Sequence, residues 1–455
     1  MVSAGLPVAE QLGLDRRRSS HGGTGGQIRT ELDDFQVEEV EAVIPEPLDA
    51  DPGAYPHVVI RVRLEGWDTN AFAHTLAGRL AISTDRVAWA GTKDARAVTT
   101  QLFSVRSTDL PTFPTLEGAT IDPIGRMGRS LQFGDLWGNR FEVVVREADA
   151  PEQAAAVAES LTSDTGTGII VPNLFGPQRF GSHRPITHRV GAAIVQGRYQ
   201  DAVRRYLTET AASEPAETAA ARAAVADAFA ADAPEWGGLG DAFGRGLRFE
   251  RALLQRAAEV QPASELEWRE VLEVLPWNLQ RLFVHAFQAA LFNRLVAMRM
   301  GAGLSLERPL DGDRIGFIDM DAPAGFAQPD LNRQTTATAD TCGQIDRHCR
   351  AGRAFVLGPL VGTETTPTEG RPGELERAVL TAANVEPGDF ALPDPYHSTG
   401  TFRPLAVHID LDLQVGEPAG GYTLRFDLPS GSYATAVTRE FIGQAELYPP
   451  VSEDG

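Results

Sequence analysis

Two patterns of apolar spacing divide the chain into strand-like ends and a helix-like middle. Val58, Ile60, Val62 and Leu64 alternate with polar residues, as in a half-buried strand. We predict further strands at residues 28–40, 87–90, 99–105, 131–133, 141–145, 168–171, 407–413 and 422–428, with a turn at Gly138-Asn139 between the strands at 131–133 and 141–145. We predict helices at residues 69–80, 151–163, 192–208, 215–231, 245–260, 277–300 and 432–442, the first of them capped by Asp68 or Thr69. This order predicts an α+β fold in which a mainly helical segment interrupts a domain with a mixed or antiparallel sheet.

The domain boundaries are expected where the pattern changes. At 455 residues the chain has room for two to four domains of about 150 residues each. We assign residues 1–184 and 399–455 to one domain and residues 185–398 to an insertion, whose second half is rich in Gly, Pro and Asp. No apolar run reaches the roughly 18 residues of a membrane span, and the N-terminus lacks a signal-peptide pattern, so we expect a cytoplasmic protein.

The charge composition indicates a salt-adapted protein. Asp and Glu number 62 against 41 for Lys and Arg, which gives a formal net charge of -21. A single lysine, Lys93, leaves 41 - 1 = 40 arginines. Carboxylates hold hydrated cations, and the guanidinium is less strongly hydrated than an ammonium. A GC-rich genome that favours Arg codons is the alternative, but it explains the acidic excess less well.

The two cysteines do not predict a metal site. Cys342 and Cys349 lie near His348, but the spacing is not one of the usual zinc patterns and no fourth ligand is evident. We therefore expect ordinary reduced thiols and no metal.

The only lysine lies in the segment that most invites a chemical interpretation. Lys93 and Asp94 stand side by side between two predicted strands, which would hold the carboxylate of Asp94 rigidly. The turn has neither the glycines of a phosphate loop nor metal partners, so any chemistry there would come from the carboxylate. A lone Asp in a turn is more often structural, and that alternative stays open.

A second segment combines aromatic and amide side chains. Residues 173–181 read NLFGPQRFG. The glycines permit close approach of a ligand, Phe175 offers a stacking face, and Asn173 or Gln178 could bond the polar edge of a base. Arg179 adds a cation. An ordinary aromatic-anchored loop is the alternative.

Local arginine clusters could contact phosphates despite the acidic composition. Arg126 and Arg129 form one cluster, and residues 183–189, HRPITHR, form another. Solvated surface arginines are the alternative interpretation.

These segments, in this order, resemble the TruD family of tRNA pseudouridine synthases over most of the chain. The matching segments are residues 34–39 (DFQVEE), 90–101 (AGTKDARAVTTQ), 138–141 (GNRF), 173–181 (NLFGPQRFG), 290–293 (ALFN), 428–435 (LPSGSYAT) and 439–440 (RE). The resemblance implies a pseudouridine-synthase-like catalytic domain interrupted by an inserted TRUD domain. It also implies isomerisation of the uridine at position 13 of tRNA, without a metal or an organic cofactor.

The resemblance assigns roles to individual residues. It makes Asp94 the catalytic residue. Arg29 stands where many members have a Lys, which keeps a positive charge that would hold Asp94 ionised. The side chains that we expect to contact tRNA are Lys93, Arg126, Arg129, Asn139, Asn173, Phe175, Gln178 and Arg179.

The chemistry leaves several routes open. A carboxylate could add to C6 of the base, or attack or deprotonate the sugar, and the sequence does not choose between them. We expect a monomer whose partner is tRNA. The alternative is a non-catalytic RNA-binding or chaperone protein of the same fold. A carboxylate-dependent hydrolase would need a second carboxylate across the cleft, and the Lys-Asp turn has one.

The net charge of -21 predicts that folding requires salt. The Debye length grows from ~3 Å at 1 M salt to ~10 Å at 0.1 M, so dilution strengthens self-repulsion. Binding of tRNA is nevertheless expected to persist in high salt, because recognition would depend on stacking and shape more than on phosphate contacts. Circular dichroism and tRNA affinity, each followed from about 0.1 to 3 M KCl, test both statements. A chain fully folded at the low end, or tRNA binding lost at the high end, would contradict them.

Overall fold

The computed structural model describes residues 8–93, 95–163, 168–181, 184–211, 214–323 and 325–443. It confirms the α+β fold with a mixed sheet. The main sheet has the order β14-β15-β7-β2-β5-β3-β6, with β1 paired to β7 and β4 paired to β5. Its strands are β1 (Gln27–Ile28), β2 (Phe35–Glu41), β3 (His57–Glu65), β4 (Val87–Trp89), β5 (Val98–Arg106), β6 (Ala119–Met127), β7 (Leu136–Arg146), β14 (Asp412–Val415) and β15 (Tyr422–Pro429). Strands from both ends of the chain therefore build one sheet.

The register of the central strands brings four of the motif segments side by side. β2 runs parallel to β5, with Gln36 opposite Val98, and antiparallel to β7, with Glu39 opposite Asn139. Asn139 in turn faces Leu428 of β15. Segments far apart in sequence thus meet at the centre of the sheet.

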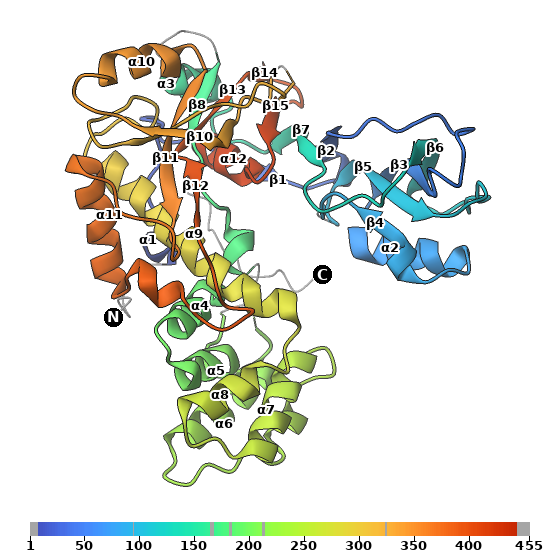
Figure 1. Cartoon of the computed structure of the whole chain (residues 1–455), viewed down its shortest axis with the longest axis vertical. Helices are drawn as coiled ribbons and strands as arrows, with labels where there is room; N and C mark the ends of the chain where they lie inside the picture. The colour runs from blue at the N-terminus through green and yellow to red at the C-terminus, as the bar shows by residue number, and fades with distance from the viewer. Residues whose placement is uncertain are drawn as a thin grey trace.

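The remaining elements form a helical group and two smaller sheets (Figure 1). One sheet has the order β10-β9-β11-β12 and the other pairs β8 with β13. These strands are β8 (Ile169–Pro172), β9 (Arg314–Ile318), β10 (Pro329–Thr336), β11 (Ala354–Leu360), β12 (Thr401–Pro404) and β13 (Ala406–Ile409). The helices are α1 (Val8–Gln11), α2 (Thr69–Arg79), α3 (Gln153–Leu161), α4 (Thr187–Val195), α5 (Tyr199–Thr208), α6 (Ala216–Ala230), α7 (Arg248–Val260), α8 (Glu265–Leu272), α9 (Trp277–Gly301), α10 (Cys342–Arg350), α11 (Gly370–Ala383) and α12 (Ala434–Ile442). In Figure 1, α5–α8 gather at the bottom and β3–β6 with α2 lie at the right.

The long helix α9 joins two cores. Phe283 and Phe287 pack with the helices α4–α8, whereas Phe292 and Val296 pack with the smaller sheets. No helix in the described ranges is both long and apolar enough to cross a membrane. Cys342 and Cys349, both in α10, are free thiols.

Several predicted elements are correct and some are wrong. Asp68 caps α2 as expected, because its carboxylate accepts hydrogen bonds from the backbone N–H groups of Asn70 and Ala71. The predicted helix at 192–208 is two helices, α4 and α5, separated at Gly197, whose φ is +69°. The strand β6 and the helices α8, α10 and α11 were not predicted.

The predicted strand at 131–133 and the turn at Gly138-Asn139 are both wrong. Residues 131–135 form the loop between β6 and β7, and Gly138 lies inside β7. A Cβ on Gly138 would come within 2.1 Å of the carbonyl oxygen of Leu428 and within 2.7 Å of the Phe326 ring. Close packing, and not a turn, explains this glycine.

The described side chains of the cluster at 183–189 contact other parts of the protein. Arg184 donates to the carbonyls of Tyr206 and Glu209, and Arg189 forms an ion pair with Glu209. His188 is buried and packs edge-on against Phe180. These side chains pack and pair around α4, and their contact with phosphate stays a prediction; His183 lies outside the described residues.

Burial of His188 predicts a loss of stability in acid. Burial, and then the nearby charges of Arg294, Arg189 and Arg205, lower the pKa of His188 from 6.5 to about 3. Between these values the unfolded chain binds a proton that the folded chain does not. The free energy of unfolding therefore falls by about 1.4 kcal/mol for each pH unit below 6.5 from this group alone.

The His188→Met variant should lose that part of the pH dependence, and His74→Met, at an exposed position, should retain it. Urea unfolding between pH 7.5 and about pH 4.5, at constant high KCl, measures both slopes. Equal slopes in the two variants would contradict the assignment.

Candidate active site

The ammonium of Lys93 is buried in a polar network at the centre of the main sheet. Its Nζ lies 2.8 Å from Oε1 of Glu39 and donates a hydrogen bond of 2.8 Å to Oδ1 of Asn139. The Lys93 side chain is 8% exposed and that of Glu39 is 2% exposed. Glu39 and Asn139 face each other across β2 and β7, so the ammonium bonds to both strands.

The backbone around Lys93 is held as firmly as its side chain. The Lys93 N–H donates to Oγ1 of Thr69, at the start of α2, and Gln101 of β5 donates to the same hydroxyl. A Cβ on Gly91 would lie 3.3 Å from Oε1 of Glu39 and 3.4 Å from Nζ of Lys93. A side chain at this position would therefore require the Glu39 carboxylate to shift slightly.

Burial sets the electrostatics of the pair. Removal from water raises the pKa of Glu39, and the charge and hydrogen bond of Lys93 oppose that rise. The second oxygen, Oε2, accepts a hydrogen bond from the Leu102 N–H. A buried ion pair with further hydrogen bonds is rigid, and loss of one partner would leave an unpaired buried charge.

Asp94, the predicted catalytic residue, lies outside the described residues. Its neighbour Lys93 is fixed as above, and residues 95–97 lead directly into β5. Arg29 lies near this end of β5, because its guanidinium stacks on the Phe35 ring at 4.1 Å and Gln36 pairs with Val98. The φ of Arg29 is +63°, a strained value of a kind that clusters at functional sites.

The segment 173–181 is anchored by two buried polar side chains. Asn293 of α9 accepts a hydrogen bond from the Phe175 N–H and donates one to the Phe175 carbonyl. Arg403 of β12 donates to the backbone and side-chain oxygens of Asn173, and its guanidinium covers the Phe175 ring at 4.3 Å. The segments 290–293 and 173–181 therefore meet in space.

The end of β15 brings this segment towards the Lys93 network. Leu428 pairs with Asn139, which accepts the Lys93 bond. Just beyond β15, the Gly431 carbonyl accepts from Arg403 and the Ser432 hydroxyl donates to Asn173. A chain of direct contacts thus connects Lys93 to the segment 173–181.

Three residues predicted to contact tRNA have structural roles. Phe175 is 6% exposed, packs edge-on against Phe292 and lies under the guanidinium of Arg403. The amide of Asn173 is occupied by Arg403, Ser432 and the Pro404 carbonyl. Arg126 is 3% exposed and donates to four backbone carbonyls, those of Leu48, Tyr55, Ser107 and Thr108. The polar groups of Asn173 and Arg126 and most of the Phe175 ring are in contact with protein, and contact of these three residues with tRNA stays a prediction.

The other predicted contacts are placed differently. Lys93 and Asn139 bond to each other inside the network. Arg129 is exposed and donates to both oxygens of Asp135. Gln178 is exposed and Arg179 is partly exposed, so these two remain proposals.

Four side chains support the candidate site in ways that we did not predict from the sequence: Glu39, Thr69, Asn293 and Arg403. Glu39 carried a readable signal, because Phe35, Val37 and Glu39 share the buried face of one strand. A carboxylate in that series requires a buried cation. The other three depend on contacts between distant segments.

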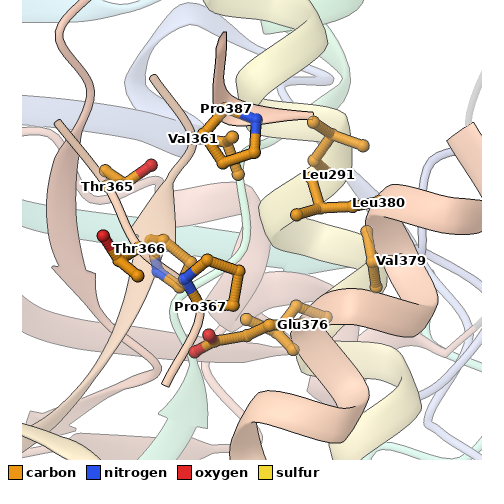
Figure 2. Close-up of a pocket in the computed structure, with 11 residues that line it drawn as sticks. Leu291, Val361, Thr365, Thr366, Pro367, Glu376, Val379, Leu380 and Pro387 are labelled. Carbon is orange, nitrogen blue, oxygen red and sulfur yellow. The ribbon is translucent and has the colours of Figure 1, made fainter. Parts of the chain in front are cut away.

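Two cavities lie away from the Lys93 network. Figure 2 shows an apolar pocket between α9 and α11, with Leu291 and Glu376 among its lining residues. Its volume of about 20 Å³ suits a water and not a nucleotide. An open hollow of about 700 Å³ lies beside residues 15–18 and 303–308. Within the described ranges, no group of three or more His, Cys, Asp or Glu side chains could hold a metal ion.

Comparisons with known proteins agree with this arrangement. The family model of tRNA pseudouridine synthase D (TruD) matches residues 11–441. A Halobacterium salinarum protein named "Probable tRNA pseudouridine synthase D" is 44% identical over 441 residues, which cover 97% of this chain and 98% of that protein. A Natronomonas pharaonis protein of the same name is 46% identical over 439 residues, with 96% and 97% covered.

A solved structure shares the fold. The crystal structure of a TruD protein from Methanosarcina mazei superposes with a TM-score of 0.78 at 32% identity, and covers 96% of this chain and 98% of that one. The chain therefore belongs to the TruD family, as its motifs indicated. The relatives in Halobacterium and Natronomonas are proteins of halophilic archaea, which fits the acidic composition.

The buried pair predicts strong coupling between Glu39 and Lys93. Glu39→Met or Lys93→Met alone should each lower the free energy of unfolding by about 3–5 kcal/mol, because each leaves one buried charge unpaired. The double variant should be more stable than either single variant. Urea unfolding of the four proteins in high KCl measures the coupling.

Glu41→Met is the matched control on the same strand. Its partner Arg61 is largely exposed, so this change should cost only about 0–1 kcal/mol. Additive losses at Glu39 and Lys93 would show that the two side chains do not stabilise each other.

Proposed function

We propose that the protein isomerises a uridine of tRNA to pseudouridine, with Asp94 as the catalytic carboxylate. One observation carries the assignment of the site. The residue directly before Asp94 is fixed by side-chain contacts to β2 and β7 and a backbone contact to α2, in a chain that belongs to the TruD family. Rigid support of this kind is what a positioned catalytic group requires.

The reaction needs no added atoms. The N1–C1′ bond breaks, the uracil rotates, and a C5–C1′ bond forms. The proton on C5 is lost and N1 ends the reaction protonated, so atoms and electrons balance without an oxidant or reductant. Asp94 would assist by addition at C6, by attack at the sugar, or by removal of a sugar proton, and the geometry of the described residues favours none of these.

The surrounding residues have supporting roles. Arg29 would keep Asp94 ionised, since a nearby cation favours the charged carboxylate. The target uridine must leave its stack, at a cost of a few kcal/mol. We assign contacts with RNA to Gln178, which is exposed, and to Arg179, which is partly exposed.

The finer parts of the proposal follow from family membership. We assign the reaction to position 13 of tRNA, residues 1–184 and 399–455 to the catalytic domain, and residues 185–398 to the inserted domain. Each rests on the resemblance of motifs and on the return of the chain to the main sheet in β14 and β15.

Asp94→Asn should abolish pseudouridine formation and leave folding and tRNA affinity close to wild type. The amide has nearly the same shape but is neither a nucleophile nor a base. Single-turnover assays with unmodified tRNA, read by carbodiimide modification and primer extension, measure the effect. Turnover within about tenfold of wild type would remove Asp94 from the catalytic role.

Arg29→Lys should be tolerated and Arg29→Ala should not, because the proposal requires a positive charge and not a particular geometry. Alanine also removes the stacking on Phe35, worth about 0.5–1 kcal/mol of stability. Melting temperatures of the variants separate that loss from the loss of kcat. Equal kcat in the wild type and both variants would show that Arg29 does not act on Asp94.

A further inference from the structure

The loop between β6 and β7 is rigid although it is exposed. Both oxygens of Asp135 accept from Arg129, and Oδ2 also accepts from the Gln132 N–H. At the start of the loop, the Leu131 N–H donates to the Ser104 hydroxyl of β5. Leu131 is buried against Leu102 and Val59. The loop therefore holds one shape without help from a partner.

This rigid loop displays an aromatic ring to solvent. Phe133 is 78% exposed, more than any other described Phe or Trp side chain. A single exposed apolar residue is common on protein surfaces and carries no function by itself. Its position on the molecule decides whether it matters.

The position of Phe133 is beside the proposed active site. The N–H of the next residue, Gly134, donates 2.8 Å to the carbonyl of Ala90, which directly precedes Gly91. Leu136 would lie 3.9 Å from a Cβ on Gly91. Leu102, which packs against Leu131, also donates to Glu39, the partner of Lys93. Leu102 therefore contacts both the loop and the Lys93 network, and Ala90 ties the loop to the start of the turn.

We propose that Phe133 is a stacking platform for a nucleobase of tRNA that lies next to the reacting uridine. The inference rests on the proposed function, which places tRNA at this turn. Phe175 is buried in the free protein, whereas Phe133 offers an exposed aromatic ring beside the same turn. Two further points favour stacking over a phosphate contact at this loop. The cation of the loop, Arg129, is already paired with Asp135, and salt does not screen base stacking as it screens phosphate contacts.

The test compares Phe133→Ala, Phe133→Leu and Phe133→Trp with the wild type. The probe is an unmodified tRNA transcript with uridine at position 13, at about 2 M KCl, where phosphate contacts are weakened. Loss of one base stack predicts that Phe133→Ala and Phe133→Leu raise the Kd and the KM about 5- to 150-fold, and that Phe133→Trp stays near wild type. Melting temperatures should not change, because the ring is exposed.

Leu110→Ala is the control. Leu110 is 51% exposed and follows β5 at the end opposite residues 95–97. Its removal should alter neither the Kd nor the KM. Unchanged binding in Phe133→Ala, or equal binding by the Leu and Trp variants, would overturn the stacking assignment.

The binding and turnover readouts separate the two proposals. If wild-type protein forms pseudouridine and Phe133→Ala binds tRNA normally, the reaction stands and the platform fails. If wild-type protein forms none and Phe133→Ala still binds tRNA more weakly than Phe133→Trp, the contact stands and the proposed reaction fails.

Discussion

The buried ion pair between Lys93 and Glu39 is the contact on which the arrangement of the site depends. A charge this far from water is tolerated only when its partner and hydrogen bonds are in place, so the pair constrains every strand that it touches. Glu39 belongs to β2, Asn139 to β7 and Leu102 to β5, and all three bond within the network. The network of one buried ammonium therefore links three strands that backbone pairing brings side by side.

The same interaction explains why a chain of forty arginines keeps one lysine. A compact ammonium on a flexible stem donates to Glu39 and Asn139 in a space that is 8% exposed. A planar guanidinium with five donors would leave N–H groups without acceptors there. Surface pairs such as Arg61–Glu41 are screened in concentrated salt, whereas the buried pair is screened much less. The site thus depends on an interaction that concentrated salt weakens little.

Periodicity predicted most of the strands and helices, because alternation at β3 and the capped stripe of α2 are local properties. It failed where contacts between distant segments decide the outcome. Gly138 is needed for packing against Leu428 and Phe326, and residues 131–135 are held as a loop by Asp135. At the candidate site, the motifs singled out segments that the structure brings together, but they did not predict the contacts of each side chain. Phe175 and Asn173 are occupied by Arg403, which is 230 residues from Asn173, and no local pattern reports such a partner.

The most direct measurement is a map of pseudouridine in tRNA treated with the wild-type protein. Purified protein in high KCl would be incubated with an unmodified transcript and with a matched transcript that carries cytidine at position 13. We predict one new pseudouridine, at position 13 of the first transcript, and none in the second. Absence of pseudouridine from the first transcript, when the protein is folded and binds it, would contradict the central claim that this turn isomerises uridine.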